Sequence, residues 1–95
     1  MIRIDAEILF YSSEEGGQHA VCSGISLSLD VDGSLIACSV YVGEEGTVVK
    51  QGVRLEGTLR IWYGEFYEDS LRFGEVYRLM VGSRQIGEAR LIGRG

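Results

Sequence analysis

The sequence predicts an all-β protein, folded as a closed antiparallel β-barrel of six strands. Alternation of apolar and polar residues with a period of two recurs along almost the whole chain, which is typical of strands with one buried face. β-Branched and aromatic residues dominate the apolar runs, and 14 glycines with no proline supply the bends. Closure is favoured because it removes exposed strand edges, and we expect residues 1–95 to form a single domain.

The first half of the chain predicts three strands. Residues 2–10 place five apolar side chains on one face and charged residues on the other, and residues 25–31 alternate in the same way. Asp32-Gly33 is a dipeptide typical of tight hairpins and leads into a strand over residues 35–42. That strand is nearly continuously apolar, so we expect burial on both of its faces or a twisted edge.

The second half predicts three more strands. Residues 53–61 alternate, and residues 63–71 form a longer connection rich in aromatic and acidic side chains. The last two strands are expected at about residues 75–81 and 85–92. Glycine-marked turns at residues 12–19 and 82–87 are interpreted as connections between antiparallel strands.

The net charge of −5 bears on the choice of partner. An acidic surface repels phosphate backbones at long range, which disfavours RNA and DNA. Eight of the nine basic residues are arginines, and we interpret them as members of surface ion pairs. No apolar stretch approaches the roughly 20 residues of a membrane-spanning helix, and residues 1–7 alternate like a strand, so we expect a cytoplasmic protein without membrane contact.

Cys22 and Cys38 lie in strand-like runs and lack the spacing of a zinc or thioredoxin motif. We expect reduced, partly buried thiols, with a bridge between neighbouring strands as the alternative. The spacing of histidine, cysteine and carboxylates indicates no metal site and no cofactor.

Three glycine motifs, in order along the chain, resemble the third, C-terminal barrel domain of bacterial elongation factor Tu. They are Glu15-Gly16-Gly17-Gln18-His19, the hairpin Asp30-Val31-Asp32-Gly33-Ser34, and Gly74 to Gly87, which keeps Gly82, Tyr77, Leu79 and Arg84. The similarity extends over nearly the whole chain. It implies a Greek-key barrel that docks onto other molecules, and a bacterial translation-factor-like protein.

The sequence departs from that family in informative ways. Gln18 stands where the family has arginine, which puts an RNA contact in doubt, and Lys50-Gln51-Gly52-Val53 lacks the proline and aspartate of the matching turn. In the full factor this barrel contacts the T-arm of aminoacyl-tRNA, the nucleotide-exchange partner and the GTPase domain. No phosphate-binding loop occurs anywhere in the chain, so nucleotide hydrolysis is excluded.

His19 is the only histidine and the natural candidate for acid–base chemistry. Its position in a turn favours a structural role, in which it hydrogen-bonds to shape the loop. Glu14 and Glu15 beside it are expected to point apart into solvent, and Cys22 lies too close in sequence to act with His19 across a cleft. The sequence therefore indicates no catalytic residue and favours a protein that is not an enzyme.

The densest aromatic cluster comprises Trp62, Tyr63, Phe66 and Tyr67. Trp62 falls on the polar phase of its strand, so it is expected at the surface, where aromatic rings anchor protein interfaces or stack on bases. The alternative is that the cluster seals one end of the barrel. Glu65, Glu68 and Asp69 around it favour a protein or basic-peptide partner.

These observations favour a non-enzymatic protein-binding module. The alternatives are RNA binding through a stripe of Arg3, Arg84, Arg90 and Arg94, a small enzyme that uses His19, and self-association through an exposed strand or the aromatic patch around Trp62. The candidate partner-binding residues are Gln18, His19, Trp62, Tyr63, Phe66, Tyr67 and Arg84.

Overall fold

The computed structural model describes residues 1–94 and contains the predicted six strands. Short 3-10 helices, η1 and η2, lie in two of the connections. The longer connection predicted at residues 63–71 contains η2. In chain order the elements are β1 (Ile2–Phe10), η1 (Ser13–Glu15), β2 (Ile25–Val31), β3 (Ser34–Tyr41), β4 (Arg54–Ile61), η2 (Gly64–Ser70), β5 (Val76–Val81) and β6 (Arg84–Arg94).

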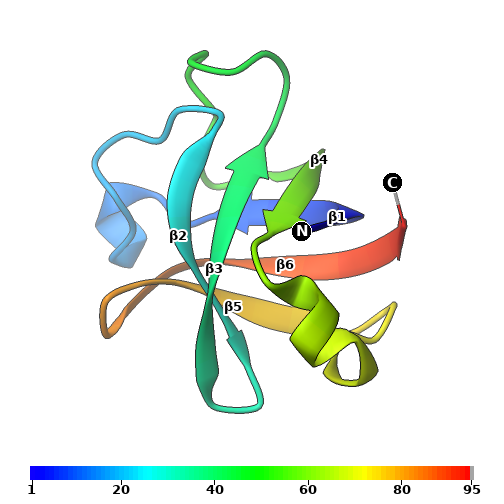
Figure 1. The fold of residues 1–95 in the computed structure, drawn as a ribbon. Helices are drawn as coiled ribbons and strands as arrows, with labels where there is room; N and C mark the ends of the chain where they lie inside the picture. Colours follow the sequence, from blue (N-terminus) through cyan, green and yellow to red (C-terminus); the bar gives the residue numbers. More distant parts are fainter. Residues whose placement is uncertain (95) are drawn as a thin grey trace.

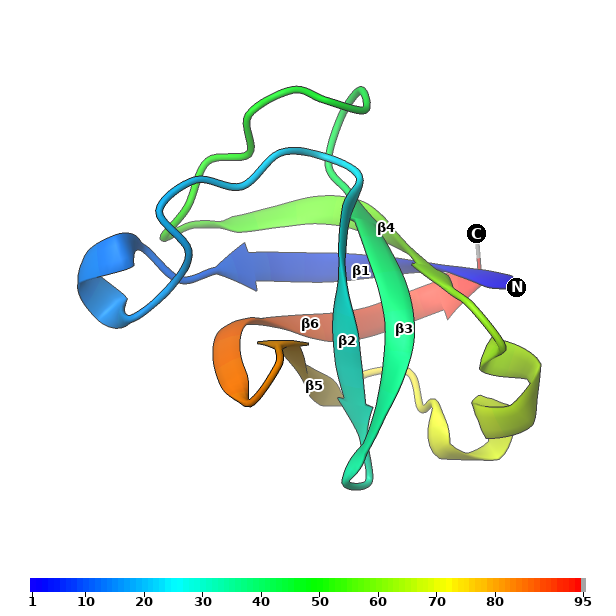
Figure 2. The ribbon, with the colours of Figure 1, turned by 60° about the vertical axis from the view of Figure 1, so that its left-hand side comes forward.

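The six strands form one closed antiparallel barrel in the order β1-β4-β3-β2-β5-β6, which confirms the predicted fold class (Figure 1). Strands β2, β3 and β4 are neighbours in sequence order, and β1 lies beside β4. This arrangement is the Greek key that the resemblance implies. The two termini lie close together, because β1 pairs with β6 up to Ile4 and Arg94 (Figure 2).

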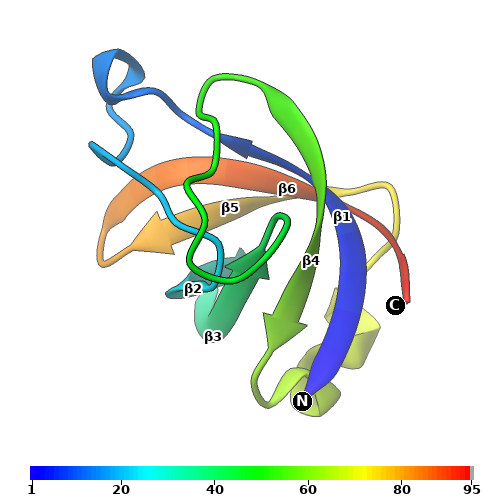
Figure 3. The same ribbon diagram turned by 90° about the horizontal axis from the view of Figure 1, so that it is seen from above.

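The glycine turn at residues 12–19 does not join neighbouring strands, so that prediction is wrong. Strand β1 pairs with β4 and β6, never with β2, and the segment after it crosses one end of the barrel (Figure 3). There it runs beside the β3–β4 loop. Cys22 and Val48 pair through an isolated antiparallel β-bridge, which joins the two segments. Val21 and Val49 from the two segments are buried and close this end. The second predicted turn does form a hairpin, between β5 and β6.

The core forms because each strand turns every second side chain inward. In β1 the inward set is the predicted one: Ile2, Ile4, Ala6, Ile8 and Phe10 are all buried. The other strands contribute a matching apolar set, and the removal of these side chains from water is the main force that stabilises the fold. Among the largest fully buried side chains are those of Leu29, Val31, Val40, Leu59, Ile61, Leu79, Ile86 and Leu91.

Gly87 allows β6 to approach β1 closely. The register between β5 and β6 shifts between Leu79 and Met80, which marks a bulge that leaves Ile86 as the extra residue of β6. A Cβ atom at Gly87 would overlap the carbonyl oxygen of Leu9 and lie 3.1 Å from the Cα of Phe10. Both obstacles are backbone, so they cannot move aside as a flexible side chain would.

We therefore expect Gly87→Ala to lower the free energy of unfolding by about 2 kcal/mol or more, because an overpacked backbone contact must be relieved. Gly93→Ala is the matched control in the same strand, since a Cβ there meets nothing within 4 Å. Its effect should be about 0.5 kcal/mol or less in either direction. Urea unfolding of the three proteins measures both values, and equal stabilities of the two variants would contradict this account.

Candidate binding surface

The predicted aromatic cluster divides into exposed and partly buried members. The exposed fractions are 81% for Phe66, 69% for Tyr63 and 41% for Trp62, so these three rings face solvent. Tyr67 is half-buried and packs against the core with Leu71. Tyr67 therefore helps to seal the end of the barrel, as the alternative interpretation predicts. The other three rings form an exposed surface.

The exposed rings border a hollow between β3 and η2. Its volume is about 260 Å³, and the exposed Leu35 of β3 continues the apolar surface. Exposed apolar groups gathered in one hollow are more informative than exposed residues scattered singly. We call this feature the aromatic hollow; it is lined by Leu35, Ile36, Ala37, Trp62, Tyr63, Phe66 and Tyr67.

Trp62 is fixed at the rim of the aromatic hollow by two hydrogen bonds to β3. Its backbone N–H donates to the carbonyl of Ala37 at 3.0 Å, and its indole N–H donates to the hydroxyl of Ser39 at 3.3 Å. The ring is therefore held in place before any partner arrives, which lowers the entropic cost of binding.

Tyr63 has a backbone conformation that is unusual for its residue type. Its φ of 61° lies in the left-handed region, where a side chain other than that of glycine, asparagine or aspartate is uncommon. This conformation turns the chain away from β3 at the end of β4 and starts η2. A tyrosine in this conformation is an outlier, and it marks the point where the chain leaves the sheet.

Carboxylates lie on the segments beside the aromatic hollow, although none of them lines it. Residues 30–37 and 61–70 together contain Asp30, Asp32, Glu65, Glu68 and Asp69 and no basic residue, but Asp30 is opposite Arg78 of β5. Two of these five carboxylates have cationic partners: the Met1 ammonium lies 2.5 Å from Glu65, and the Arg94 guanidinium lies 2.5 Å from Glu68. The Met1 ammonium, which hydrogen-bonds to Glu65, lowers the pKa of that carboxyl.

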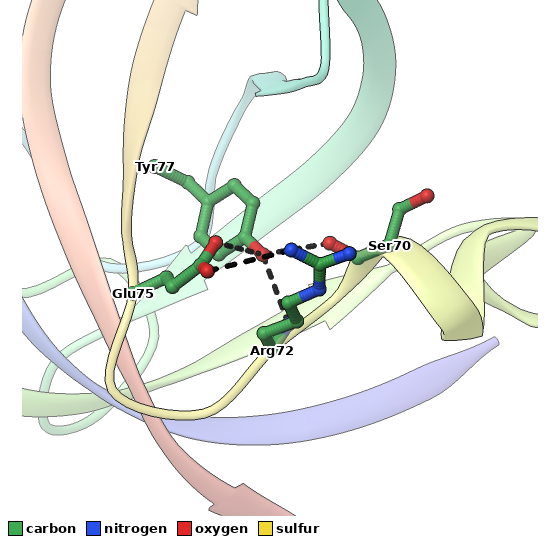
Figure 4. A network of polar contacts seen from close by, with 4 residues as sticks. All are labelled: Ser70, Arg72, Glu75 and Tyr77. Atoms are coloured by element: carbon green, nitrogen blue, oxygen red, sulfur yellow. Dashed lines mark hydrogen bonds and ion pairs between the residues drawn. The ribbon is translucent and has the colours of Figure 1, made fainter.

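The C-terminal end of η2 is anchored to the barrel by Tyr77 of β5 (Figure 4). The Tyr77 hydroxyl donates to the carbonyl of Ser70 at 2.7 Å and accepts from the backbone N–H of Arg72 at 2.9 Å. Burial raises the pKa of Tyr77, and the bond from Arg72 opposes that rise. An ion pair between Arg72 and Glu75 at 3.7 Å spans the same turn.

The other candidate binding residues lie at the opposite end of β1. Ile61, the residue before Trp62, is opposite Ile2 at the start of β1, whereas Gln18, His19 and Arg84 belong to segments near Phe10 at its end. The length of β1 separates the two groups by roughly 25 Å. The structure therefore does not bring the seven candidates into one surface.

His19 is exposed, and its side chain makes no hydrogen bond to residues 1–94, so the expected structural role is not met. The loop is held instead by the amide of Gln51, which donates to the carbonyls of Tyr11 at 2.9 Å and Gln18 at 2.6 Å. Sequence reasoning missed Gln51, although it lies in the turn that departs from the family's pattern.

The side chains weighed for acid–base, nucleophilic or metal chemistry in residues 1–94 are one histidine, two cysteines and the carboxylates of Glu14 and Glu15. No group of three or more His, Cys, Asp or Glu side chains there could hold a metal ion. Glu14 and Glu15 are both exposed, as expected, and Glu15 also accepts hydrogen bonds from the backbone N–H and the hydroxyl of Ser12. Cys22 and Cys38 are free thiols, and Cys22 is exposed rather than partly buried. Burial raises the pKa of Cys38 to about 12, so this thiol stays protonated and unreactive.

A larger hollow, of about 490 Å³, lies over the outer face of β1 and β4, but its lining is mostly polar. Asp5 within it already accepts a hydrogen bond from Thr58 at 3.4 Å. Because it offers neither clustered apolar side chains nor converging charges, it is a weaker candidate than the aromatic hollow.

The arginines proposed for an RNA-binding stripe are partly engaged with carboxylates. Arg90 lies 4.0 Å from Glu7, and Arg94 is paired with Glu68. Arg84 begins β6 at the β5–β6 hairpin, whereas Arg3 is opposite Arg60 near the start of β1. The four arginines therefore do not form an uninterrupted positive stripe.

The chain was compared with known proteins. No protein-family profile matches its sequence, and no curated protein is significantly similar to it. None of the helices in residues 1–94 has both the length and the apolar character needed to cross a bilayer.

We expect Tyr77→Phe to lower the free energy of unfolding by about 1 to 3 kcal/mol, because the variant leaves the Ser70 carbonyl and the Arg72 N–H without their partner. Tyr63→Phe removes the same atom from an exposed ring and is the matched control, with an expected change of about 0.5 kcal/mol or less. Denaturant unfolding measures both changes. Equal effects of the two substitutions would show that the Tyr77 hydroxyl does not anchor η2.

Proposed function

We propose that the chain is a non-enzymatic module that binds another protein through the aromatic hollow. The observation that supports this most is the exposure of Trp62, Tyr63 and Phe66 together on one surface. Tryptophan and tyrosine are enriched among the residues that contribute most to protein–protein binding energy. Keeping such rings in water confers no folding stability, so a partner that covers them accounts for their position.

The charge around the hollow indicates the chemistry of the partner. Carboxylates dominate the segments that form it, and the whole chain has a net charge of −5. A partner surface with apolar residues flanked by lysine or arginine is complementary to this pattern, whereas a phosphate backbone is repelled by it. The proposal therefore places a basic protein segment, and not RNA, on the aromatic hollow.

We propose in addition that the chain is related to the C-terminal barrel of elongation factor Tu and acts in the cytoplasm. The three glycine motifs are the basis of this part of the proposal, and the six-stranded Greek-key barrel is in keeping with it. In that family the barrel works by docking, which agrees in kind with a binding role. Gln18 and His19 would then lie on a second surface, away from the aromatic hollow.

The test is affinity capture from an extract of the cells that express the chain naturally. Three immobilised proteins are compared: wild type, a Trp62→Ala/Phe66→Ala double variant, and the control Phe73→Ala, which removes an exposed ring outside the aromatic hollow. We expect one or more proteins to be retained by wild type and control and at least about tenfold less by the double variant.

Mass spectrometry identifies the retained proteins, and sequencing identifies any retained RNA. Circular dichroism establishes that the double variant is folded. Equal retention by all three immobilised proteins would contradict a binding role for the aromatic hollow. Retention of RNA alone at 50 mM salt, lost as salt rises, would favour the RNA alternative instead.

A further inference from the structure

Strand β3 extends beyond the point where β4 leaves it. The β3–β4 pairing begins at Cys38 and Ile61 and runs to Tyr41 and Thr58, so residues 34–37 of β3 have no paired strand on that side. The short β3–β4 pairing closes the barrel here. The part of β3 before this pairing has an unpaired edge. This edge borders the aromatic hollow, since Leu35, Ile36 and Ala37 all line it.

The register shows which backbone groups face the open side. Val31 and Ser34 close the two-residue hairpin, so Ser34 and Ile36 direct their N–H and C=O groups to β2. Leu35 and Ala37 direct theirs the other way. The Ala37 carbonyl accepts from the Trp62 N–H, and within residues 1–94 that is the only backbone bond on this side of residues 34–37.

Three backbone groups are consequently free to pair: the N–H and C=O of Leu35 and the N–H of Ala37. An open edge of this kind is a template for an added strand, because an incoming backbone can supply the missing partners. The left-handed turn at Tyr63 keeps the edge open by directing the chain into η2. The space that a continued β4 would fill is the aromatic hollow.

We propose that the occupant of this space is an extended peptide segment of another protein, which adds a strand to the edge of β3. This inference rests on the proposed function and names the class of partner: alternating apolar and basic residues. Its apolar side chains contact the rings of Trp62, Tyr63 and Phe66. Its lysine or arginine side chains lie near the carboxylates of η2 and the β2–β3 hairpin.

The charges select this occupant over a second copy of the chain. A second copy carries the same net charge of −5, so long-range repulsion opposes the pairing of two β3 edges. A basic peptide has the opposite sign to the carboxylates of the chain, so its binding strengthens as salt concentration falls.

The probe is a synthetic acetylated and amidated heptapeptide that alternates lysine with valine, isoleucine and phenylalanine. We expect it to bind the full chain in a titration followed by NMR, and to protect the Leu35 and Ala37 amides from hydrogen exchange. A peptide with glutamate in place of lysine should bind at least about tenfold more weakly. The Phe66→Ala variant should lose affinity for the lysine peptide by a similar factor.

Two N-methylated versions of the peptide test strand addition itself. Methyl groups on one alternating set of amides should weaken binding by about tenfold or more, because those N–H groups face β3, while methyl groups on the other set should leave it nearly unchanged. Equal effects of the two sets would overturn strand addition. In the protein, Leu35→Pro removes the backbone N–H that faces the peptide, so it should weaken binding as the first set of methyl groups does. Leu35→Thr keeps that N–H and is the matched control.

The outcomes separate this inference from the proposed function. Peptide binding that depends on Phe66 but leaves the Leu35 and Ala37 amides unprotected would overturn strand addition and leave a binding role for the hollow intact. If the peptide does not bind but the aromatic hollow still retains proteins from the extract, strand addition is likewise overturned and the binding role of the hollow stands. Protection of Leu35 that rises with protein concentration, without peptide, would identify a second copy as the occupant and overturn the proposal.

Discussion

The divergence of β4 from β3 after Ile61 shapes the whole surface around the aromatic hollow. Up to that residue, inter-strand hydrogen bonds hold the two strands together, and Trp62 adds one bond to Ala37. Tyr63 then adopts a left-handed conformation, and the chain enters η2 instead of continuing the sheet. One local backbone choice thus creates both the exposed rings and the unpaired edge beside them. A β4 extended by a few residues would cover Leu35 and fill the hollow with the chain's own atoms.

The rest of the barrel acts as a rigid support for this one region. Inward apolar side chains from all six strands fix the strand positions, and the crossing loops bury Val21 and Val49 to close the far end. At the near end, Tyr67 packs against the core and Tyr77 anchors the segment after η2. Phe66 therefore lies on a short helix that is held at both ends, and Trp62 and Tyr63 lie directly before that helix, so these rings would lose little further freedom on binding.

Much of this architecture could be predicted from the sequence, because period-two alternation reports directly which face of a strand is buried. The same alternation predicts that Trp62 is exposed, because it lies two residues after Arg60 and therefore on the polar face of the strand. The 12–19 turn was misassigned because glycine signals a bend but does not say which strands become neighbours. The apolar run at residues 35–42 predicts either burial on both faces or an edge; Leu35 is exposed and residues 34–37 have no partner in β4, so the first alternative fails at this end of the strand. The open edge depends on where β3 and β4 separate, which is set by their register and by Tyr63.

Hydrogen–deuterium exchange of the free protein, read by NMR at individual amides, tests this account most directly. Ile36 and Ser39 pair with β2 and β4 respectively, so their amides should exchange slowly, at rates close to those of the barrel core. The amides of Leu35 and Ala37 flank Ile36 on the same strand and should exchange rapidly. Slow exchange at Leu35 and Ala37 in dilute monomeric protein would show that the edge is already covered, and would contradict the account.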